Sequence, residues 1–185
     1  MNTKQIALVL MMGALGNILF AISSYLGYIA PSVAFDFSLL AAFIAAFFGG
    51  PTLGFTAGLL VGVLPGIMFG PLGNGGWLGL VGLPVGKALS GLTAGLIAKG
   101  LNLGQKPHSS LIAVPATLLA YVPEAIFTYA YFAFLLPIFL GQGGELIFFL
   151  ILPKALFEVS IISVIIAALM DNKGFNDFIR TYFPK

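Results

Sequence analysis

The sequence predicts an all-α integral membrane protein, a single-domain bundle of six transmembrane helices over residues 1–185. Hydrophobic residues make up 59% of the chain, charged residues make up only 8%, and the mean hydropathy is +1.08. Soluble domains carry about 25% charged residues, so this chain could not cover a water-facing surface. Apolar segments of membrane-spanning length recur along the chain. Glycines spaced four residues apart further predict close packing between helices.

Six apolar segments are predicted to be spans, because a span needs about 20 apolar residues. They cover residues 5–27, 35–49, 51–72, 76–99, 109–140 and 144–170. The first segment resembles a signal peptide, but as a span it completes an even helix count. The second is short and ends at a Gly-Gly-Pro turn. The fifth is predicted to be kinked, because its prolines each remove a helix hydrogen bond (Pro115, Pro123, Pro137).

The distribution of lysine and arginine predicts the orientation. With six spans, the cationic residues outside the spans all fall on one side: Lys4, Lys99, Lys106, Lys173, Arg180 and Lys185. The opposite loops carry no Lys or Arg and have Asp36 and Glu145 at their edges. Cytoplasmic loops are enriched in Lys and Arg, so both termini are predicted to be cytoplasmic and the protein to lie in the cell membrane. The cytoplasmic tail, residues 171–185, is predicted to form a short amphipathic helix along the inner surface.

A ladder of glycines runs through the third predicted span: Gly50, Gly54, Gly58, Gly62, Gly66 and Gly70. Inside a membrane, such small residues let two helix backbones approach closely. Residues four apart drift by about 40° per step on an ideal helix, and Pro65 interrupts the run. We therefore predict that the first three glycines meet one neighbour or a partner subunit. The last three are predicted to meet the fourth span, which has small residues at the same spacing.

Four ionisable residues lie deep inside the predicted spans: Lys87, Glu124, Lys154 and Glu158. A charge at mid-membrane costs about 2.5–3.5 kcal/mol on insertion scales, so such residues face a bundle interior or a cavity. Lys154 and Glu158 are four residues apart and share a helix face. The fifth span adds a polar stripe along one helix face: Thr117, Tyr121, Glu124, Thr128 and Tyr131.

These residues predict one polar pocket between the first, fourth, fifth and sixth spans. Its predicted substrate-binding residues are Asn17, Lys87, Tyr121, Glu124, Thr128, Tyr131, Lys154 and Glu158. Three interpretations of the charges stay open. They could surround a polar ligand, form structural ion pairs, or relay protons or ions. A lid or pocket mouth is predicted from Tyr25, Tyr28, Asn74 and Trp77, and the alternative for Trp77 is an anchor at the membrane interface.

Several function classes are not expected. The sequence contains no P-loop, no H-E-x-x-H and no G-x-S-x-G motif, so no enzyme activity or cofactor is predicted. It contains no cysteine and one histidine, so no metal site is predicted. A net charge of +2 is too small to indicate nucleic-acid binding. Active transport would need energy from another subunit or from an ion gradient.

Two stretches match the pattern of a known family. Residues 35–40 read Phe-Asp-Phe-Ser-Leu-Leu, and residues 47–54 read Phe-Phe-Gly-Gly-Pro-Thr-Leu-Gly, before the glycine-rich third span. Residues 84–87 (Pro-Val-Gly-Lys), with Gly91 and Gly95, are similar to the family's fourth span. In these features the chain resembles the substrate-binding S components of energy-coupling factor (ECF) transporters.

The resemblance implies uptake of a vitamin or similar micronutrient from outside the cell. The partners it implies are a transmembrane T subunit, two ATPase subunits and the lipid bilayer. The family's pocket lies between the first outer loop and spans four to six. Many members dock through Ala-x-x-x-Ala in the first span, a motif absent here, so docking is predicted at Gly13, Ala14, Gly54 and Gly58.

Two other functions compete with that of an importer subunit. A stand-alone proton-coupled secondary carrier would use Glu124 or Glu158 as a proton relay. A non-transport membrane scaffold would use the buried charges only as structural pins.

Overall fold

The computed structural model describes residues 1–30, 33–73, 75–103, 109–141 and 144–182. The chain is an all-α membrane protein with one small β-hairpin. Among the described residues, five helical stretches are long and apolar enough to cross a membrane. They are α1 (Thr3–Tyr25), α3 with α4 (Pro51–Val61 and Val63–Phe69), α5 (Gly76–Leu101), α6 through α7 (Ser109–Leu140), and α8 (Glu145–Asp171). The remaining elements are β1 (Tyr28–Ala30), β2 (Val33–Ala34), α2 (Leu39–Gly49) and α9 (Lys173–Tyr182).

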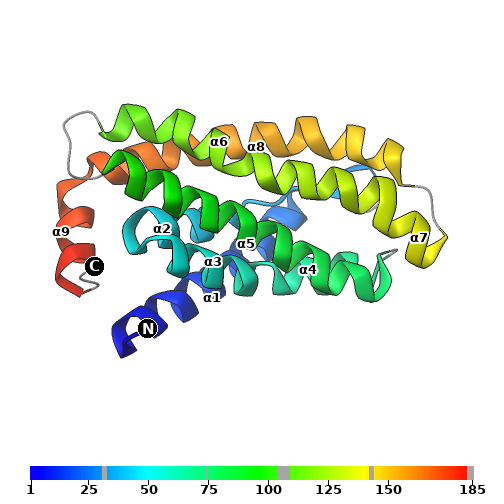
Figure 1. Cartoon of the computed structure of the whole chain (residues 1–185), viewed down its shortest axis with the longest axis horizontal. Helices are drawn as coiled ribbons and strands as arrows, with labels where there is room; N and C mark the ends of the chain where they lie inside the picture. The colour runs from blue at the N-terminus through cyan, green and yellow to red at the C-terminus, as the bar shows by residue number, and fades with distance from the viewer. Residues whose placement is uncertain (31–32, 74, 104–108, 142–143, 183–185) are drawn as a thin grey trace.

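The long helices lie side by side in an elongated bundle (Figure 1). The chain runs away from the end that carries both termini in α1, α3 with α4, and α6, and it returns in α2, α5 and α8 (Figure 1). Helix α9 closes the terminal end, where the ring of Phe175 lies 5.1 Å from that of Phe48 in α2. The tail is therefore a separate short helix, as the sequence predicts.

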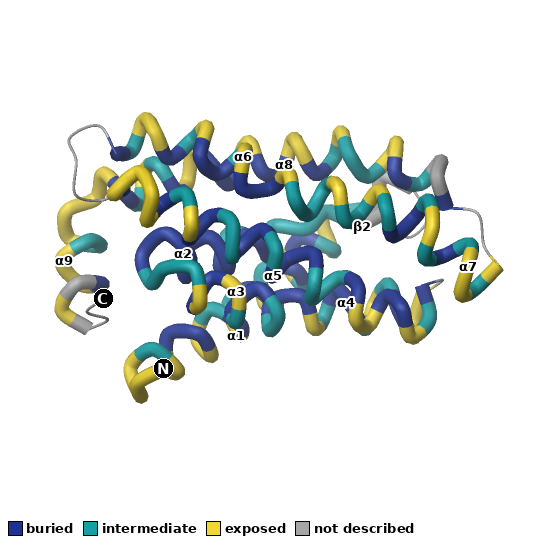
Figure 2. Tube along the Cα trace, viewed as in Figure 1, coloured by how far each residue is buried: buried dark blue, intermediate teal, exposed yellow. Residues whose placement is uncertain are grey.

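Helix α2 is a core helix that is too short to cross a bilayer. Its 11 residues extend about 16 Å, against a hydrocarbon thickness of about 30 Å. All of its residues except Leu40 and Gly49 are buried, and the α2 trace is dark throughout most of its length in Figure 2. The predicted start at residue 35 is wrong, because residues 35–38 are not helical. There the Asp36 carboxylate accepts a hydrogen bond from the Ser38 backbone N–H.

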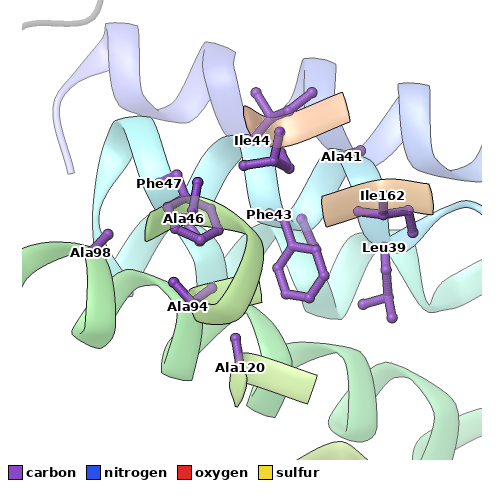
Figure 3. Close-up of a cluster of buried hydrophobic side chains, with 14 of the residues drawn as sticks. Leu39, Ala41, Phe43, Ile44, Ala46, Phe47, Ala94, Ala98, Ala120 and Ile162 are labelled. Carbon is purple, nitrogen blue, oxygen red and sulfur yellow. The ribbon is translucent and has the colours of Figure 1, made fainter. Parts of the chain in front are cut away.

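The main hydrophobic core surrounds α2. Phe43 and Phe47 of α2 are buried with Ala94 of α5, Ala120 of α6 and Ile162 of α8 (Figure 3). A second, smaller core lies toward the far end and contains Leu78, Tyr131, Phe132, Leu136 and Phe148. The small residues of α2, α5 and α6 let these helices approach closely, which is how membrane helices gain packing contacts.

The glycine ladder packs against α5 along both of its halves. A Cβ atom at Gly54 would clash with the Gly91 carbonyl oxygen, and one at Gly62 would clash with the Pro84 Cα atom. A Cβ atom at Gly58 would lie 2.5 Å from the Lys87 carbonyl oxygen. The predicted division of the ladder between two neighbours is therefore wrong. The drift expected on one straight helix does not apply, because α3 ends and α4 begins at Gly62.

The fifth predicted span is interrupted only near its end. Helix α6 continues through Pro115 and Pro123 to Ala130. A π-helical turn, η1 (Tyr131–Leu135), follows, and the Leu136 N–H donates to the Tyr131 carbonyl oxygen. Single π-turns inside helices are frequent at functional sites. Here the turn buries two consecutive aromatic residues, Tyr131 and Phe132.

Candidate binding site

A cavity of about 340 Å³ lies inside the bundle. Small-molecule sites in proteins are typically of about 300–1,000 Å³, so this cavity could hold a small organic ligand. Most of its walls come from the last part of α4, the first half of α5, the second half of α6 with η1, and the first half of α8. It therefore lies in the half of the bundle away from the termini. The short α2 leaves room there, because Leu39 at the start of α2 and Asp36 before it both line the cavity.

Seven of the eight predicted substrate-binding residues line this cavity: Lys87, Tyr121, Glu124, Thr128, Tyr131, Lys154 and Glu158. They come from α5, from α6 with η1, and from α8. The polar stripe of the fifth span thus faces inward. Its member Thr117 is also buried, but it lies outside the cavity and donates to the Ala113 carbonyl oxygen. Whether these residues bind a solute stays a prediction.

Lys87 is held by two groups from the segment before α2. Its ammonium Nζ lies 2.6 Å from Asp36 Oδ2 and donates to Ser38 Oγ at 2.8 Å. The sequence places Asp36 at the edge of an outer loop and within the stretch that resembles the S components, but not among the predicted binding residues, whereas the structure places it in the site. The Asp36 carboxylate therefore balances the charge of Lys87.

Lys154 and Glu158 form the second ion pair, with Nζ 3.2 Å from Oε2 across one turn of α8. Glu158 also accepts a hydrogen bond from the Asp36 backbone N–H at 2.6 Å. The two ion pairs are thus connected through Asp36, and together they fasten the segment before α2 to both α5 and α8. Of the four buried ionisable residues named from the sequence, only Lys154 and Glu158 pair with each other, whereas Lys87 pairs with Asp36. Whether these pairs serve structure alone stays a prediction.

Glu124 stands apart from both pairs. Its Oε2 accepts a hydrogen bond from Ser90 Oγ at 2.6 Å. Within the described residues, no lysine or arginine nitrogen lies within 4.0 Å of its carboxylate. Gly86 faces Glu124 from α5, where a Cβ atom would lie 3.4 Å from Glu124 Cγ, so the glycine leaves space beside this side chain.

Tyr131 contributes a buried hydroxyl with no hydrogen-bond partner among the described residues. The residue is 3% exposed and lines the cavity. Gly82 makes room for its ring, since a Cβ atom there would lie 2.5 Å from Tyr131 Cε2. Buried polar groups are paired in the great majority of cases, so this hydroxyl is an exception among the described residues.

Aromatic rings surround the polar groups. Phe69 of α4, Phe127 of α6, and Tyr131 and Phe132 of η1 all line the cavity. The Phe69 and Phe132 ring centroids are 5.8 Å apart, and those of Phe127 and Tyr131 are 6.5 Å apart. The walls can therefore contact a flat ring while the charged groups hold its polar substituents.

Asn17 is the predicted binding residue that does not line the cavity. Its Nδ2 donates to the carbonyl oxygens of Gly13 at 2.7 Å and Leu60 at 2.9 Å. Its Oδ1 accepts from the Leu64 N–H at 2.8 Å. The amide thus bridges the Leu60 carbonyl and the Leu64 N–H across the break between α3 and α4, next to Pro65. The structure therefore does not bring Asn17 to the cavity, because both sides of its amide already bond backbone groups.

Of the four predicted lid residues, the two whose side chains the structure describes do not lie at the cavity. Tyr25 is 91% exposed and Trp77 is 56% exposed, and neither lines the cavity. The Trp77 ring lies 5.7 Å from that of Phe139 instead. Asn74 lies outside the described residues, as does the side chain of Tyr28, whose backbone belongs to β1.

Three of the four predicted docking residues are buried inside the chain. Gly13 packs against Leu60, where a Cβ atom would lie 2.8 Å from Leu60 Cβ, and Gly54 and Gly58 pack against α5. Their use as a free docking surface is therefore wrong for this structure. Ala14 is exposed.

Sequence reasoning missed Asp36, Ser38 and Ser90 as members of the site. One signal was present, since Lys87 needed an acidic partner and Asp36 begins the shortest apolar segment. The aromatic walls carried no signal, because phenylalanine is common throughout the chain. No protein-family model, curated protein or solved structure matches the chain, so the geometry of the site carries the functional argument.

Proposed function

We propose that the chain is the substrate-binding membrane subunit, or S component, of an ECF-type importer that takes up a vitamin-like micronutrient. The observation that carries this proposal is the cavity of about 340 Å³, which combines ionisable and aromatic walls inside a membrane bundle. Buried ionisable residues in membrane proteins mark substrate or ion sites by default. The sequence contains no P-loop, so the energy for this proposed import would come from other subunits. The proposed partners are therefore a T subunit and two ATPase subunits.

The proposed topology has six passes with both termini in the cytoplasm and α2 as an incomplete, buried pass. Lys4 lies in the first turn of α1, Lys99 lies in the last turn of α5 and Lys173 begins α9, and these three helix ends all lie at the terminal end of the bundle (Figure 1). This end is the proposed cytoplasmic side by the distribution of positive charge. The cavity then lies in the outer half of the membrane, where a solute from outside enters.

The absence of cysteine from the sequence makes this topology directly testable. In intact cells, we expect an impermeant thiol reagent to label Leu72→Cys and to leave Lys4→Cys and Lys173→Cys unlabelled until the cells are opened. Labelling of all three, or of the lysine positions alone, would contradict the proposed orientation.

The function is tested by binding and by co-purification. We expect the detergent-purified chain to show no ATPase activity and to gain thermal stability with one member of a panel of vitamins and amino acids. We also expect tagged protein to co-purify with two ATPases and a membrane subunit. If no solute stabilises the chain and no ATPase accompanies it, the importer proposal fails and the scaffold interpretation replaces it.

A proton-coupled carrier is the second candidate, because Glu124 lacks a cationic partner within the described residues. Proteoliposomes that contain the chain alone distinguish the two. Uptake driven by a proton gradient without ATPase subunits, and lost in Glu124→Gln, would establish the carrier and overturn the importer.

A further inference from the structure

We propose that the solute held in this cavity carries a protonated nitrogen on a flat ring system, with the nitrogen bound at Glu124 and the ring held by the aromatic wall. This inference rests on the proposed function and specifies the chemical class of its substrate. It is drawn from the charge balance, the free space and the unpaired polar groups of the cavity.

The cavity is lined by one more carboxyl group than ammonium groups. Three carboxyl groups line it, those of Asp36, Glu124 and Glu158, against the two ammonium groups of Lys87 and Lys154. Each lysine is committed to another acid, Lys87 to Asp36 at 2.6 Å and Lys154 to Glu158 at 3.2 Å. A buried carboxylate without a cation is costly, so a cation brought by the ligand would be stabilised there.

Glu124 is also the carboxyl group with room beside it. Its Oε2 already accepts from Ser90 Oγ, and a carboxylate has further acceptor sites. Gly86 faces it without a side chain, and both residues line the cavity. By contrast, the carboxylate of Glu158 accepts from Asp36 N and from Lys154. A ligand N–H group can therefore approach Glu124 without breaking an existing ion pair.

The aromatic wall lies close to this carboxylate along the same helix. Phe127 and Tyr131 follow Glu124 by one and two turns, and Phe69 and Phe132 complete the wall. Aromatic faces attract cations and stack against flat rings. The same groups would disfavour an anion, because its charge would meet Glu124 and the negative faces of the rings.

The unpaired hydroxyl of Tyr131 is an independent sign of a ligand. It is buried, its residue is 3% exposed, and nothing in the described residues bonds to it. A polar substituent on the ligand would satisfy it. The ligand is thus expected to have a second polar group besides its cationic nitrogen.

A matched set of three indoles tests the charge assignment. Tryptamine, tryptophol and indole-3-acetate share one ring and carry a cationic, a neutral and an anionic substituent. With the full chain in detergent, we expect tryptamine to bind at least tenfold more tightly than tryptophol, and indole-3-acetate to bind most weakly. Equal binding of the three, preference for the carboxylate, or no binding of tryptamine would overturn the inference.

Two variants test whether Glu124 and Tyr131 contact the bound indoles. Glu124→Gln should remove the preference of tryptamine over tryptophol while the protein remains folded, because the amide keeps the shape and loses the charge. Tyr131→Phe should weaken binding of tryptophol and tryptamine by a few-fold. Tyr129→Phe is the matched control, since Tyr129 lies on the same helix, is 43% exposed and does not line the cavity. Equal effects of the two tyrosine changes would contradict the assignment.

The experiment separates this inference from the proposed function. If indole-3-acetate or tryptophol binds best, and Tyr131→Phe weakens that binding, the cavity binds solutes but the cationic class is wrong. If a vitamin stabilises the chain while the indoles do not bind, the proposed importer function is supported and the proposed cationic ligand class is wrong. Failure of co-purification with ATPases bears on the proposed function alone.

Discussion

The ion pair between Asp36 and Lys87 joins a non-helical segment to the middle of α5. Buried ion pairs contribute little net stability against an apolar replacement, because desolvation offsets their attraction. Removal of one partner is a different matter, since it leaves a charge buried without compensation. Here the surviving ammonium of Lys87 would have Ser38 Oγ as its remaining hydrogen-bond acceptor.

The first prediction follows from this asymmetry. Asp36→Asn should lower the free energy of unfolding by about 3–5 kcal/mol, because Lys87 would stay buried and unpaired. The double change Asp36→Asn with Lys87→Met should recover much of that loss. Thermal unfolding in detergent measures both, and Lys173→Gln, at an exposed position, serves as the control. A double variant no more stable than the single one would contradict the pairing.

At the scale of elements, Asn17 and Gly62 determine how α3 continues into α4. Pro65 has no N–H to give to the helix and crowds the preceding turn. Next to this proline, the Asn17 amide of α1 donates to Leu60 O and accepts from Leu64 N, and it thereby bridges the break between α3 and α4. Helix α1 is thereby fastened to the junction that positions Met68 and Phe69 at the cavity.

Replacement of Asn17 by leucine is the second prediction. It should cost about 1–3 kcal/mol of stability, because the Leu60 carbonyl and the Leu64 N–H would lose their partner in a dry interior. Solute affinity should change less than stability, because Asn17 does not line the cavity. Ile18→Leu, on the exposed face of α1, should change neither quantity. A loss of solute affinity in Asn17→Leu without a loss of stability would instead indicate that Asn17 contacts the solute.

The contact between α3 and α5 gives the third prediction. Gly54→Ala and Gly91→Ala should each lower stability by about 1–3 kcal/mol, because a Cβ atom would meet the opposing backbone. Gly100→Ala should instead be neutral or stabilising by up to about 1 kcal/mol, since nothing lies within 4 Å of its Cβ position. Unfolding of the three variants in parallel checks this, and equal effects would contradict the packing.

The sequence alone located these elements to within a few residues in most cases, because apolar length and proline–glycine breaks are local signals. The fourth predicted span, 76–99, corresponds to α5, and the sixth, 144–170, to α8. Local signals failed at residues 35–38. There an interaction with Lys87, 51 positions away, helps to hold a non-helical segment that composition alone assigns to a span.

In the candidate site too, some features could be predicted from the sequence and others could not. Charged residues inside apolar segments are conspicuous in a sequence, and the four that were predicted all line the cavity. Which of them pair was harder to see, because Lys87 finds its partner in another element. Asn17 has the polarity and depth of a binding residue, and only the geometry of the α3–α4 break reveals its structural use.

At the scale of the whole molecule, two cores and one cavity divide the bundle. The core around α2 fills the half with the termini, and the smaller cluster around Phe132 lies toward the other end. Between the helices of that second half, small residues on α5 and the shortness of α2 leave the cavity. The bundle therefore combines a tightly packed half with a half that can hold a solute.

The central claim, that this cavity binds a solute, is tested most directly by ligand-induced stabilisation of a cavity-filled variant. A solute at one hundred times its dissociation constant stabilises a protein by about 2.7 kcal/mol. We expect a vitamin-like solute to raise the melting temperature of the natural chain and of Gly100→Leu, and to leave Gly86→Leu unchanged, because leucine at residue 86 would occupy the space beside Glu124. An equal rise in Gly86→Leu, or no rise with any solute in the natural chain, would contradict the claim.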